Sequence, residues 1–155
     1  QPDRMGSAHP SIVPYQAFNC RDRPLIIAVG NDTQWQTLCH VLNLEHLARR
    51  SEYSTNPQRV RNRQRLIPII SKRLRTRNAS YWNRLLNKNQ VPASMIYNIS
   101  DVVRDPQIKH RGLFKKGRSA IPTLVSPIRF AKEERSVQRP PPKLGQDTLN
   151  VLRSA

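Results

Sequence analysis

Residues 49–88 read RRSEYSTNPQRVRNRQRLIPIISKRLRTRNASYWNRLLNK and combine a helical apolar pattern with dense positive charge. The stretch contains 12 lysines and arginines and a single acid, Glu52. The helix expected from Pro57 to Arg75 has an apolar side and an opposite cationic side, at about 100° per residue. The apolar side comprises Val60, Leu66, Ile67, Ile70 and Leu74, and the cationic stripe comprises Arg61, Arg65, Lys72 and Arg75. We therefore expect a folded helix that buries one face and offers the other to an acidic partner.

Local signals place the ends of two helices in this stretch. Ser54–Pro57 supplies a capping residue followed by proline at the first helical position, which is typical of a helix start. Pro68 lies near the cationic stripe and is expected to kink this first helix. A further helix is expected over Ser80–Asn89, with Asn78 or Ser80 as its cap. Its inward side comprises Tyr81, Trp82, Leu85 and Leu86.

Upstream of this stretch, the pattern predicts a β-hairpin followed by a helix. Ile12–Phe18 alternates as a strand does, and Pro24–Val29 is typical of a buried strand. Asp32 or Thr33 can cap a helix that runs to Val41. One face of that helix is apolar and comprises Trp35, Leu38, Cys39 and Leu42.

Downstream, the chain becomes richer in proline and its expected elements are short. A strand is expected within Val91–Tyr97, and a helical turn over Ser100–Val103. Lys109–Arg118 is a second basic cluster, and its two glycines favour a loop or hairpin. Residues 131–143 form a proline-rich linker.

The order of the expected elements predicts an α+β fold. We expect a small domain with a short antiparallel sheet packed against several helices, followed by a proline-rich C-terminal extension. The predicted domains are residues 1–130 and residues 131–155, the second with a short helix over Gln146–Leu152.

The charge of the whole chain points to a polyanion as partner. The sequence has 27 lysines and arginines against 10 acids, a formal net charge of +17. Arginine outnumbers lysine in residues 49–88, which fits bidentate phosphate contacts. No signature of a base-reading RNA or DNA module is present, so we expect structured RNA bound through its phosphates. The predicted RNA-binding residues are Arg59, Arg61, Arg63, Arg65, Lys72, Arg73, Arg75, Arg77, Arg84, Lys88, Lys109, Arg111, Lys115, Lys116 and Arg118.

Few residues fit a catalytic or metal site. His9 has no nearby base in the sequence, so its pattern favours a turn residue over a catalytic one. Cys20 and Cys39 show no spacing typical of a zinc site or a disulfide framework. The acids are scattered, and Asp32 is interpreted as a helix cap. We therefore expect no catalytic residue, cofactor or metal, and no apolar run is long enough to span a membrane.

Six blocks of the sequence, in order, follow the pattern of a known enzyme family. They are GSAHPSIVPYQAF (6–18), PLIIAVGNDTQWQTLC (24–39), STNPQRVRNRQRLIPII (54–70), VPASMIYNISDVVRDPQIKHRG (91–112), SPIRF (126–130) and RPPPKLGQDTLNVL (139–152). The chain resembles the C-terminal, small-domain part of the family III CoA-transferases. This group includes formyl-CoA transferase and the carnitine and succinate–glutarate CoA-transferases.

The resemblance implies a divided chemistry. In this family an aspartate of the N-terminal half forms acyl anhydrides, and most of the CoA site lies in that half. No segment of this chain resembles that half, which implies that the chain by itself is not an enzyme. The resemblance places His9 near the family's active-site entrance. The chain departs from the family at Ala93-Ser94-Met95, where a Gly-Pro pair is common, and in residues 57–75, where basic residues replace acids.

Three hypotheses follow for the function. The first is a non-catalytic, RNA-binding structural component of a ribonucleoprotein, with a mitochondrial ribosome as the favoured particle, rRNA and neighbouring proteins as partners, and the mitochondrial matrix as location by analogy. The second is a C-terminal segment or subunit of an active family III CoA-transferase that acts with a separate catalytic chain. The third is an assembly subunit of a large protein complex without RNA contact.

Overall fold

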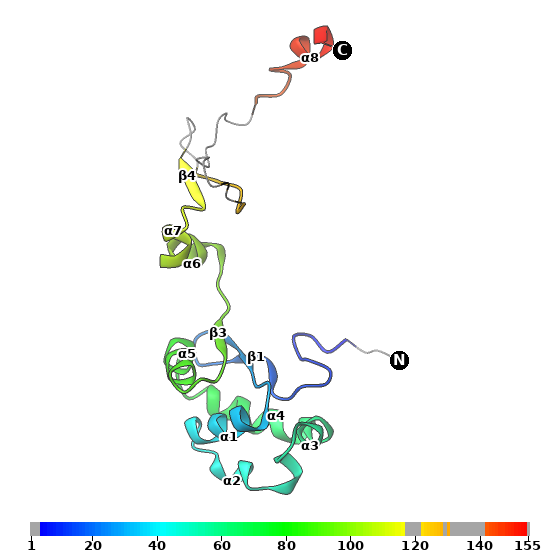
Figure 1. Cartoon of the computed structure of the whole chain (residues 1–155), viewed down its shortest axis with the longest axis vertical. Helices are drawn as coiled ribbons and strands as arrows, with labels where there is room; N and C mark the ends of the chain where they lie inside the picture. Colours follow the sequence, from blue (N-terminus) through cyan, green and yellow to red (C-terminus); the bar gives the residue numbers. More distant parts are fainter. Residues whose placement is uncertain (1–3, 117–121, 129, 131–141, 155) are drawn as a thin grey trace. The chain divides into compact units, whose positions relative to one another are not determined.

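The computed structural model describes residues 4–116, 122–128, 130 and 142–154. It contains two compact units, the N-terminal unit over Gln1–Ile96 and the C-terminal unit over Tyr97–Ala155. Figure 1 shows the elements of both units, coloured along the sequence. The domain boundary expected between residues 130 and 131 adjoins residues outside the described ones, so that boundary stays a prediction.

A three-stranded antiparallel sheet forms one layer of the N-terminal unit. Its strands, in spatial order, are β1 (Tyr15–Asn19), β2 (Pro24–Ala28) and β3 (Ala93–Met95). Phe18 pairs with Leu25, and Leu25 in turn pairs with Met95 on the other side. Leu25 and Ile27 are fully buried while Ile26 between them is exposed, because successive side chains of a strand point to opposite faces. The predicted hairpin is confirmed, with a first strand that starts later than expected.

Helices pack against the buried face of this sheet. Their bounds are α1 (Asp32–Val41), α2 (Glu45–Ala48), the 3₁₀ helix η1 (Ser51–Tyr53), α3 (Asn56–Arg61), α4 (Arg63–Leu74) and α5 (Ala79–Lys88). The cap of α1 is Asn31, whose Oδ1 accepts the N–H of Gln34 at 2.8 Å. The interpretation of Asp32 or Thr33 as this cap is therefore wrong. The amide oxygen of Asn31 reaches the orphan N–H, and the carboxylate of Asp32 is free for another contact.

The single long helix expected over residues 57–75 is two helices, α3 and α4, which meet at Asn62. The side-chain amide of Asn62 donates to the carbonyl of Gln58 at 3.0 Å and to that of Glu52 at 3.1 Å. The backbone of Asn62 departs from helical geometry, with φ −102° and ψ 17°. The interruption therefore lies at Asn62, and Pro68, where a kink was expected, lies inside α4.

The core of the N-terminal unit joins the sheet to α1, α4 and α5. Leu66, Ile70 and Leu74 of α4 are fully buried at i, i+4 and i+8, which confirms the predicted apolar side. Trp35 and Trp82 are buried as expected, and Nε1 of Trp82 donates to the carbonyl of Leu74 at 2.8 Å. Burying one such aliphatic side chain stabilises the fold by about 1.5–3 kcal/mol, so this face holds α4 against the sheet.

The C-terminal unit consists of short elements. They are α6 (Ile99–Arg104), α7 (Pro106–His110), β4 (Phe114–Lys116), β5 (Pro122–Leu124) and α8 (Thr148–Ser154). A capping box between Asn98 and Asp101 starts α6, and Asp105 caps α7. Within the basic cluster at 109–118, Lys109 and His110 end helix α7, so the expected loop or hairpin form is wrong for them. Only β4 of this cluster is a strand, and it pairs antiparallel with β5, which lies beyond the cluster; residues 117 and 118 lie outside the described residues. Most of the expected proline-rich linker, residues 131–141, lies outside the described residues.

The C-terminal unit has almost no core of its own. Val125 is the one buried residue among those the structure describes between residues 97 and 154. Large apolar side chains of this unit are instead exposed, including Ile99, Leu124, Ile128, Phe130, Leu149 and Leu152. No helix in the described part of the chain is both long and apolar enough to cross a membrane.

Candidate functional site

Three polar residues of α3 and α4 hold the segment before β1, and we call them the brace residues: Asn56, Arg59 and Arg63. The side-chain amide of Asn56 donates to the carbonyl of Ser11 at 2.8 Å, and its Oδ1 accepts the N–H of Val13 at 3.0 Å. The guanidinium of Arg63 donates to two carbonyls of the same segment, at 3.0 and 2.8 Å. An irregular segment has carbonyls that no regular element satisfies, and these donors satisfy them.

The braced segment contains the run Gly6–Ser11, which we call the His9 loop. The carbonyls that Arg63 contacts belong to His9 and Pro10. The N–H of Ala17 in β1 donates to the hydroxyl of Ser7 at 3.1 Å, and the N–H of His9 donates to the carbonyl of Tyr15 at 2.9 Å. The His9 loop is thus fixed from both sides, by β1 and by the helices.

The imidazole of His9 has a defined orientation and tautomer. Its ring stacks on Tyr15, with centroids 5.4 Å apart and planes 14° apart. The N–H of Ser11 donates to Nδ1 at 3.1 Å, so in the neutral ring the proton is on Nε2. Nε2 makes no hydrogen bond to the part of the chain that the structure describes. The half-buried His9 therefore presents a fixed N–H donor.

The brace residue Arg59 is the largest buried polar group of the N-terminal unit, with a fully buried side chain. Its Nη2 lies 2.8 Å from Oδ1 of Asp32, its Nε donates to the carbonyl of Val13 at 2.7 Å, and its guanidinium lies 5.2 Å from the ring centroid of Trp35. The prediction that Arg59 binds RNA is therefore wrong, because its charge is neutralised inside the unit. Asp32 is the counter-ion of this arginine.

Arg73 is also used inside the N-terminal unit. Its Nε donates to the carbonyl of Leu42 at 2.6 Å, and its guanidinium lies 5.8 Å from the ring centroid of Trp82. Like Arg63 it is half-buried. The side-chain donors of these arginines fasten backbone segments, and phosphate binding would compete with those contacts.

The other predicted RNA-binding residues are placed as follows. On the N-terminal unit, the exposed ones are Arg61, Arg65, Lys72, Arg75, Arg77, Arg84 and Lys88. On the C-terminal unit, Lys109 and Arg111 are exposed, Lys115 is half-buried, and Lys116 is the last residue of β4. Arg118 lies outside the described residues. The predicted RNA-binding residues thus belong to two different units, and some are engaged inside the N-terminal unit whereas others are exposed.

A hollow of about 590 Å³ lies along α4, and we call it the α4 hollow. Lys72 and Arg75 line it together with Ile67, Pro68 and Ser71. Two cations, one hydroxyl and two apolar side chains therefore meet on one exposed helix face.

The acids of the N-terminal unit are committed elsewhere. Asp22 accepts the N–H of Ala79 at 2.7 Å, and this hydrogen bond holds the pKa of its carboxyl below the ordinary value. Glu45 lies 3.2 Å from His40 and Glu52 lies 2.7 Å from Arg50. Together with Asp32, these are the acids that the structure describes in this unit, and none stands free as a nucleophile.

The two cysteines are structural. Burial raises the pKa of Cys20 to about 11 and that of Cys39 to about 12. Both thiols are therefore protonated near neutral pH and are poor nucleophiles or metal ligands. The described residues contain no group of three histidines, cysteines or acids that could hold a metal ion.

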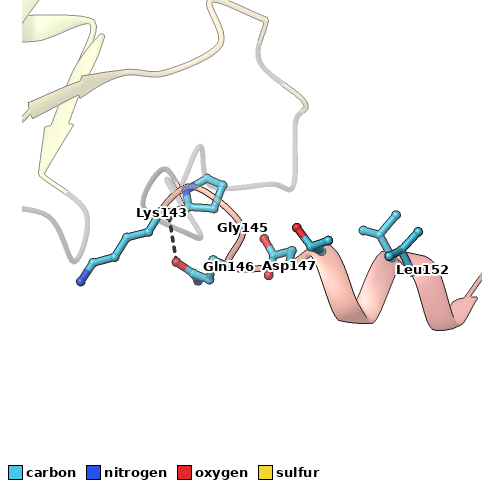
Figure 2. Close-up of a pocket in the computed structure, with 8 residues that line it drawn as sticks. Lys143, Gly145, Gln146, Asp147 and Leu152 are labelled. Atoms are coloured by element: carbon cyan, nitrogen blue, oxygen red, sulfur yellow. Dashed lines mark hydrogen bonds between the residues drawn. The ribbon is translucent and has the colours of Figure 1, made fainter.

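Two further hollows lie elsewhere in the described part of the chain. One, of about 210 Å³, lies at the sheet and is lined by Ile26, Ala28, Asn87, Pro92, Ala93 and Ser94. The other, of about 390 Å³, is formed by a single local segment around Gly145 and α8. Figure 2 shows Lys143 and Leu152 at opposite ends of this second hollow, with the ammonium group of Lys143 directed away from Asp147. The polar side chains of the first hollow are Asn87 and Ser94, and those of the second are Lys143, Gln146, Asp147 and Thr148.

Comparison with known proteins gives the family. A family model described as CoA-transferase family III matches residues 1–148. Succinyl-CoA:glutarate CoA-transferase of Homo sapiens is 39% identical over 156 residues, covering 97% of this chain and 35% of that protein. Succinate–glutarate CoA-transferase of Agrobacterium fabrum is 36% identical over 155 residues, covering 97% of this chain and 39% of that protein. The chain thus spans little more than a third of the length of these relatives.

A solved structure agrees with these matches. The crystal structure of a CAIB/BAIF family protein from Brucella suis has a TM-score of 0.86 to this chain at 35% identity, covering 99% of this chain and 40% of that one. The predicted α+β fold and the predicted family resemblance are therefore both confirmed.

These matches correct the functional hypothesis. The ribonucleoprotein hypothesis, with its ribosomal and RNA-binding role, is wrong, because the matching family model and the relatives named above are CoA-transferases. The alternative hypothesis, a segment of a CoA-transferase, fits them better. Since the family model covers nearly the whole chain, this protein belongs to CoA-transferase family III.

Proposed function

We propose that this chain is the small-domain part of a CoA-transferase that exchanges CoA between short dicarboxylic acids. The observation that carries this proposal is the match of residues 1–148 to the family model, with relatives named for succinyl-CoA and glutarate. The acids described in the N-terminal unit are engaged in caps and ion pairs. In this proposal the nucleophilic carboxylate comes from outside the described residues, and the chain alone is not catalytic.

The contribution of this chain to the reaction would be the His9 loop. A binding group works best when its geometry is fixed before the ligand arrives. Stacking on Tyr15 and the hydrogen bond from Ser11 fix His9 in this way. Its Nε2–H suits a carboxylate or thioester oxygen of the substrate, and the brace residues support the loop from behind.

A chimera tests the proposed function. This chain replaces the aligned segment of the human succinyl-CoA:glutarate CoA-transferase, and glutaryl-CoA formation from succinyl-CoA and glutarate is followed by mass spectrometry. We expect transfer by the chimera and none by the 155-residue chain alone. A chimera that folds, as judged by circular dichroism and a cooperative melt, but transfers no CoA would contradict the proposal.

Two variants of the chimera test the role of the His9 loop. His9→Phe keeps the stacked ring but removes the donor, and we expect kcat/KM to fall by about tenfold to a hundredfold. His9→Gln can still donate and should retain more activity. Equal kcat/KM values for the two variants and the unmodified chimera would show that His9 is only a turn residue.

The mitochondrial location and the neighbouring protein partners expected from the sequence stay predictions. Cell fractionation and affinity purification of the tagged chain would test them.

A further inference from the structure

Met5 lies directly before the His9 loop and contacts one of the brace residues. Nη1 of Arg63 lies 3.8 Å from Sδ of Met5. The N–H of Ala8 donates to the carbonyl of Met5 at 3.1 Å, which holds Met5 against the start of the loop. The side chain of Met5 is 39% exposed and does not belong to the buried core cluster. Met5 therefore offers solvent an exposed side chain whose sulfur lies beside a cation.

The two terminal nitrogens of Arg63 have partners of different strength. Nη2 donates to the carbonyls of His9 and Pro10 at 3.0 and 2.8 Å, and these contacts brace the His9 loop. Nη1 faces the sulfur of Met5. A thioether sulfur is a weak hydrogen-bond acceptor, whereas a guanidinium N–H is a charged and strong donor. A stronger acceptor at the position of Met5 would therefore be bound more tightly by Nη1.

We propose that Met5 is a site of reversible oxidation by hydroperoxides, and that Arg63 binds the resulting sulfoxide. In this step an S–O bond forms and the O–O bond of hydrogen peroxide breaks. The thioether loses two electrons, and the peroxide is reduced to water. The sulfoxide oxygen accepts a hydrogen bond from Nη1, since it is bonded directly to the sulfur that Nη1 already faces. The proposal does not depend on the transfer reaction.

Oxidation of Met5 tightens the His9 loop through Arg63. The same guanidinium then holds the oxidised side chain with Nη1 and the loop carbonyls with Nη2. Two amides of the loop report on this change, because the N–H of His9 donates to the carbonyl of Tyr15 and the N–H of Ser11 donates to the ring of His9. Their hydrogen exchange requires the loop to open, so tighter bracing slows the exchange.

Met95, the other methionine of the chain, is an internal control for exposure. It lies in β3, is half-buried and packs against the core cluster. When the 155-residue chain is treated with hydrogen peroxide, we expect Met5 to be oxidised at least about fivefold faster than Met95, because oxidation needs access to the sulfur. Peptide mass spectrometry measures both rates, and a methionine sulfoxide reductase should return Met5 to the thioether. Equal rates, or an oxidation that the reductase does not reverse, would overturn the proposal.

Hydrogen exchange of the intact chain tests the contact between the sulfoxide and Arg63. We expect oxidation to slow the exchange of the His9 and Ser11 amides by about threefold or more, since hydrogen bonds from charged groups are the stronger ones. Peroxide should have no such effect in Met5→Leu, which has no sulfur to oxidise at this position. Met5→Gln should slow the exchange without peroxide, because its amide oxygen is a stronger acceptor than a thioether.

Two arginine variants show which cation is responsible. In Arg63→Gln the oxidation of Met5 should no longer slow the exchange, whereas Arg61→Gln, which removes an exposed charge of α3, should keep the full effect. Circular dichroism shows whether both variants fold, and the two Met5 variants decide if Arg63→Gln does not. Unchanged or faster exchange in the oxidised chain, or equal slowing in the two arginine variants, would contradict the proposal.

Discussion

The two units of this protein differ in how their apolar residues are used. The N-terminal unit buries leucines, isoleucines and two tryptophans between a sheet and three helices, whereas the C-terminal unit leaves most of its large apolar side chains exposed. The first unit also fastens its irregular segment with Asn56, Arg59 and Arg63. The difference teaches that the stability of this chain resides in residues 4–96, and that the C-terminal unit contributes little cohesion by itself.

The sharpest contrast should come from one aliphatic truncation in each unit. Ile70→Ala should lower the free energy of unfolding by about 2–5 kcal/mol, because it opens a cavity in a fully buried site. Leu149→Ala removes a side chain that is 67% exposed, and its effect should stay within about 0.5 kcal/mol. Urea unfolding followed by tryptophan fluorescence measures both. Similar losses of unfolding free energy in the two variants would show that the two units do not differ in how their apolar residues stabilise them.

The buried arginine provides the second test. Arg59→Met should destabilise the N-terminal unit by about 3 kcal/mol, because carbonyls inside the unit lose their donor. Asp32→Asn should cost less, since the carboxylate is half exposed and water can replace part of its contact with Arg59. Chemical denaturation of both variants gives the order. A larger loss for Asp32→Asn would show that the ion pair, rather than the carbonyl contacts, dominates.

The two buried cysteines test the same core, because their burial makes the stability of the N-terminal unit depend on pH. Because their pKa values are raised in the folded chain, the unfolded chain ionises first as pH rises above about 9. The stability that the two thiols contribute is present below that pH and is lost as pH rises to about 11 for Cys20 and about 12 for Cys39. We expect Cys20 and Cys39 to resist iodoacetamide at pH 8 and to react readily in denaturant. Rapid alkylation of the folded chain, read by mass spectrometry, would contradict a tight N-terminal core.

The smallest expected effect is that of removing the C-terminal unit. A chain ending at residue 96 should unfold with a free energy within about 0.5 kcal/mol of the full chain, because the buried core cluster lies before that residue. Thermal and urea melts of the two chains provide the comparison. A large loss would show that residues 97–155 stabilise the first unit.

Much of the N-terminal unit could be predicted from sequence, because its helices and strands follow strong apolar periods. The helical wheel of residues 57–75 placed Leu66, Ile70 and Leu74 on the buried side, and all three are in the core. The same wheel puts Arg59, Arg63 and Arg73 on the apolar side, and this was the available signal for their internal roles. The sequence prediction included these three arginines among the RNA-binding residues because it used the number of charges and not their position on the helix. A cation on an apolar face is stable only when carbonyls or an acid surround it, and those partners come from distant residues such as Val13 and Leu42.

The His9 loop was harder to predict. Its fixed form depends on contacts between Ser7 and Ala17, and between His9 and both Tyr15 and Arg63. No local period encodes such contacts, since each joins an irregular segment to another element. A turn was therefore the reasonable interpretation of His9 from sequence, and the geometry adds a defined tautomer and a free Nε2.

The position of β3 has a consequence for synthesis of this protein on the ribosome. Ala93–Met95 pairs with Leu25–Ile27, so the last strand of the sheet joins a partner made almost seventy residues earlier. Closing so long a loop costs entropy that the pairing must recover. The edge of β2 stays unpaired on the side of β3 until Ala93–Met95 leaves the exit tunnel. The N-terminal unit therefore completes its sheet only after all of its residues up to Met95 have left the ribosome.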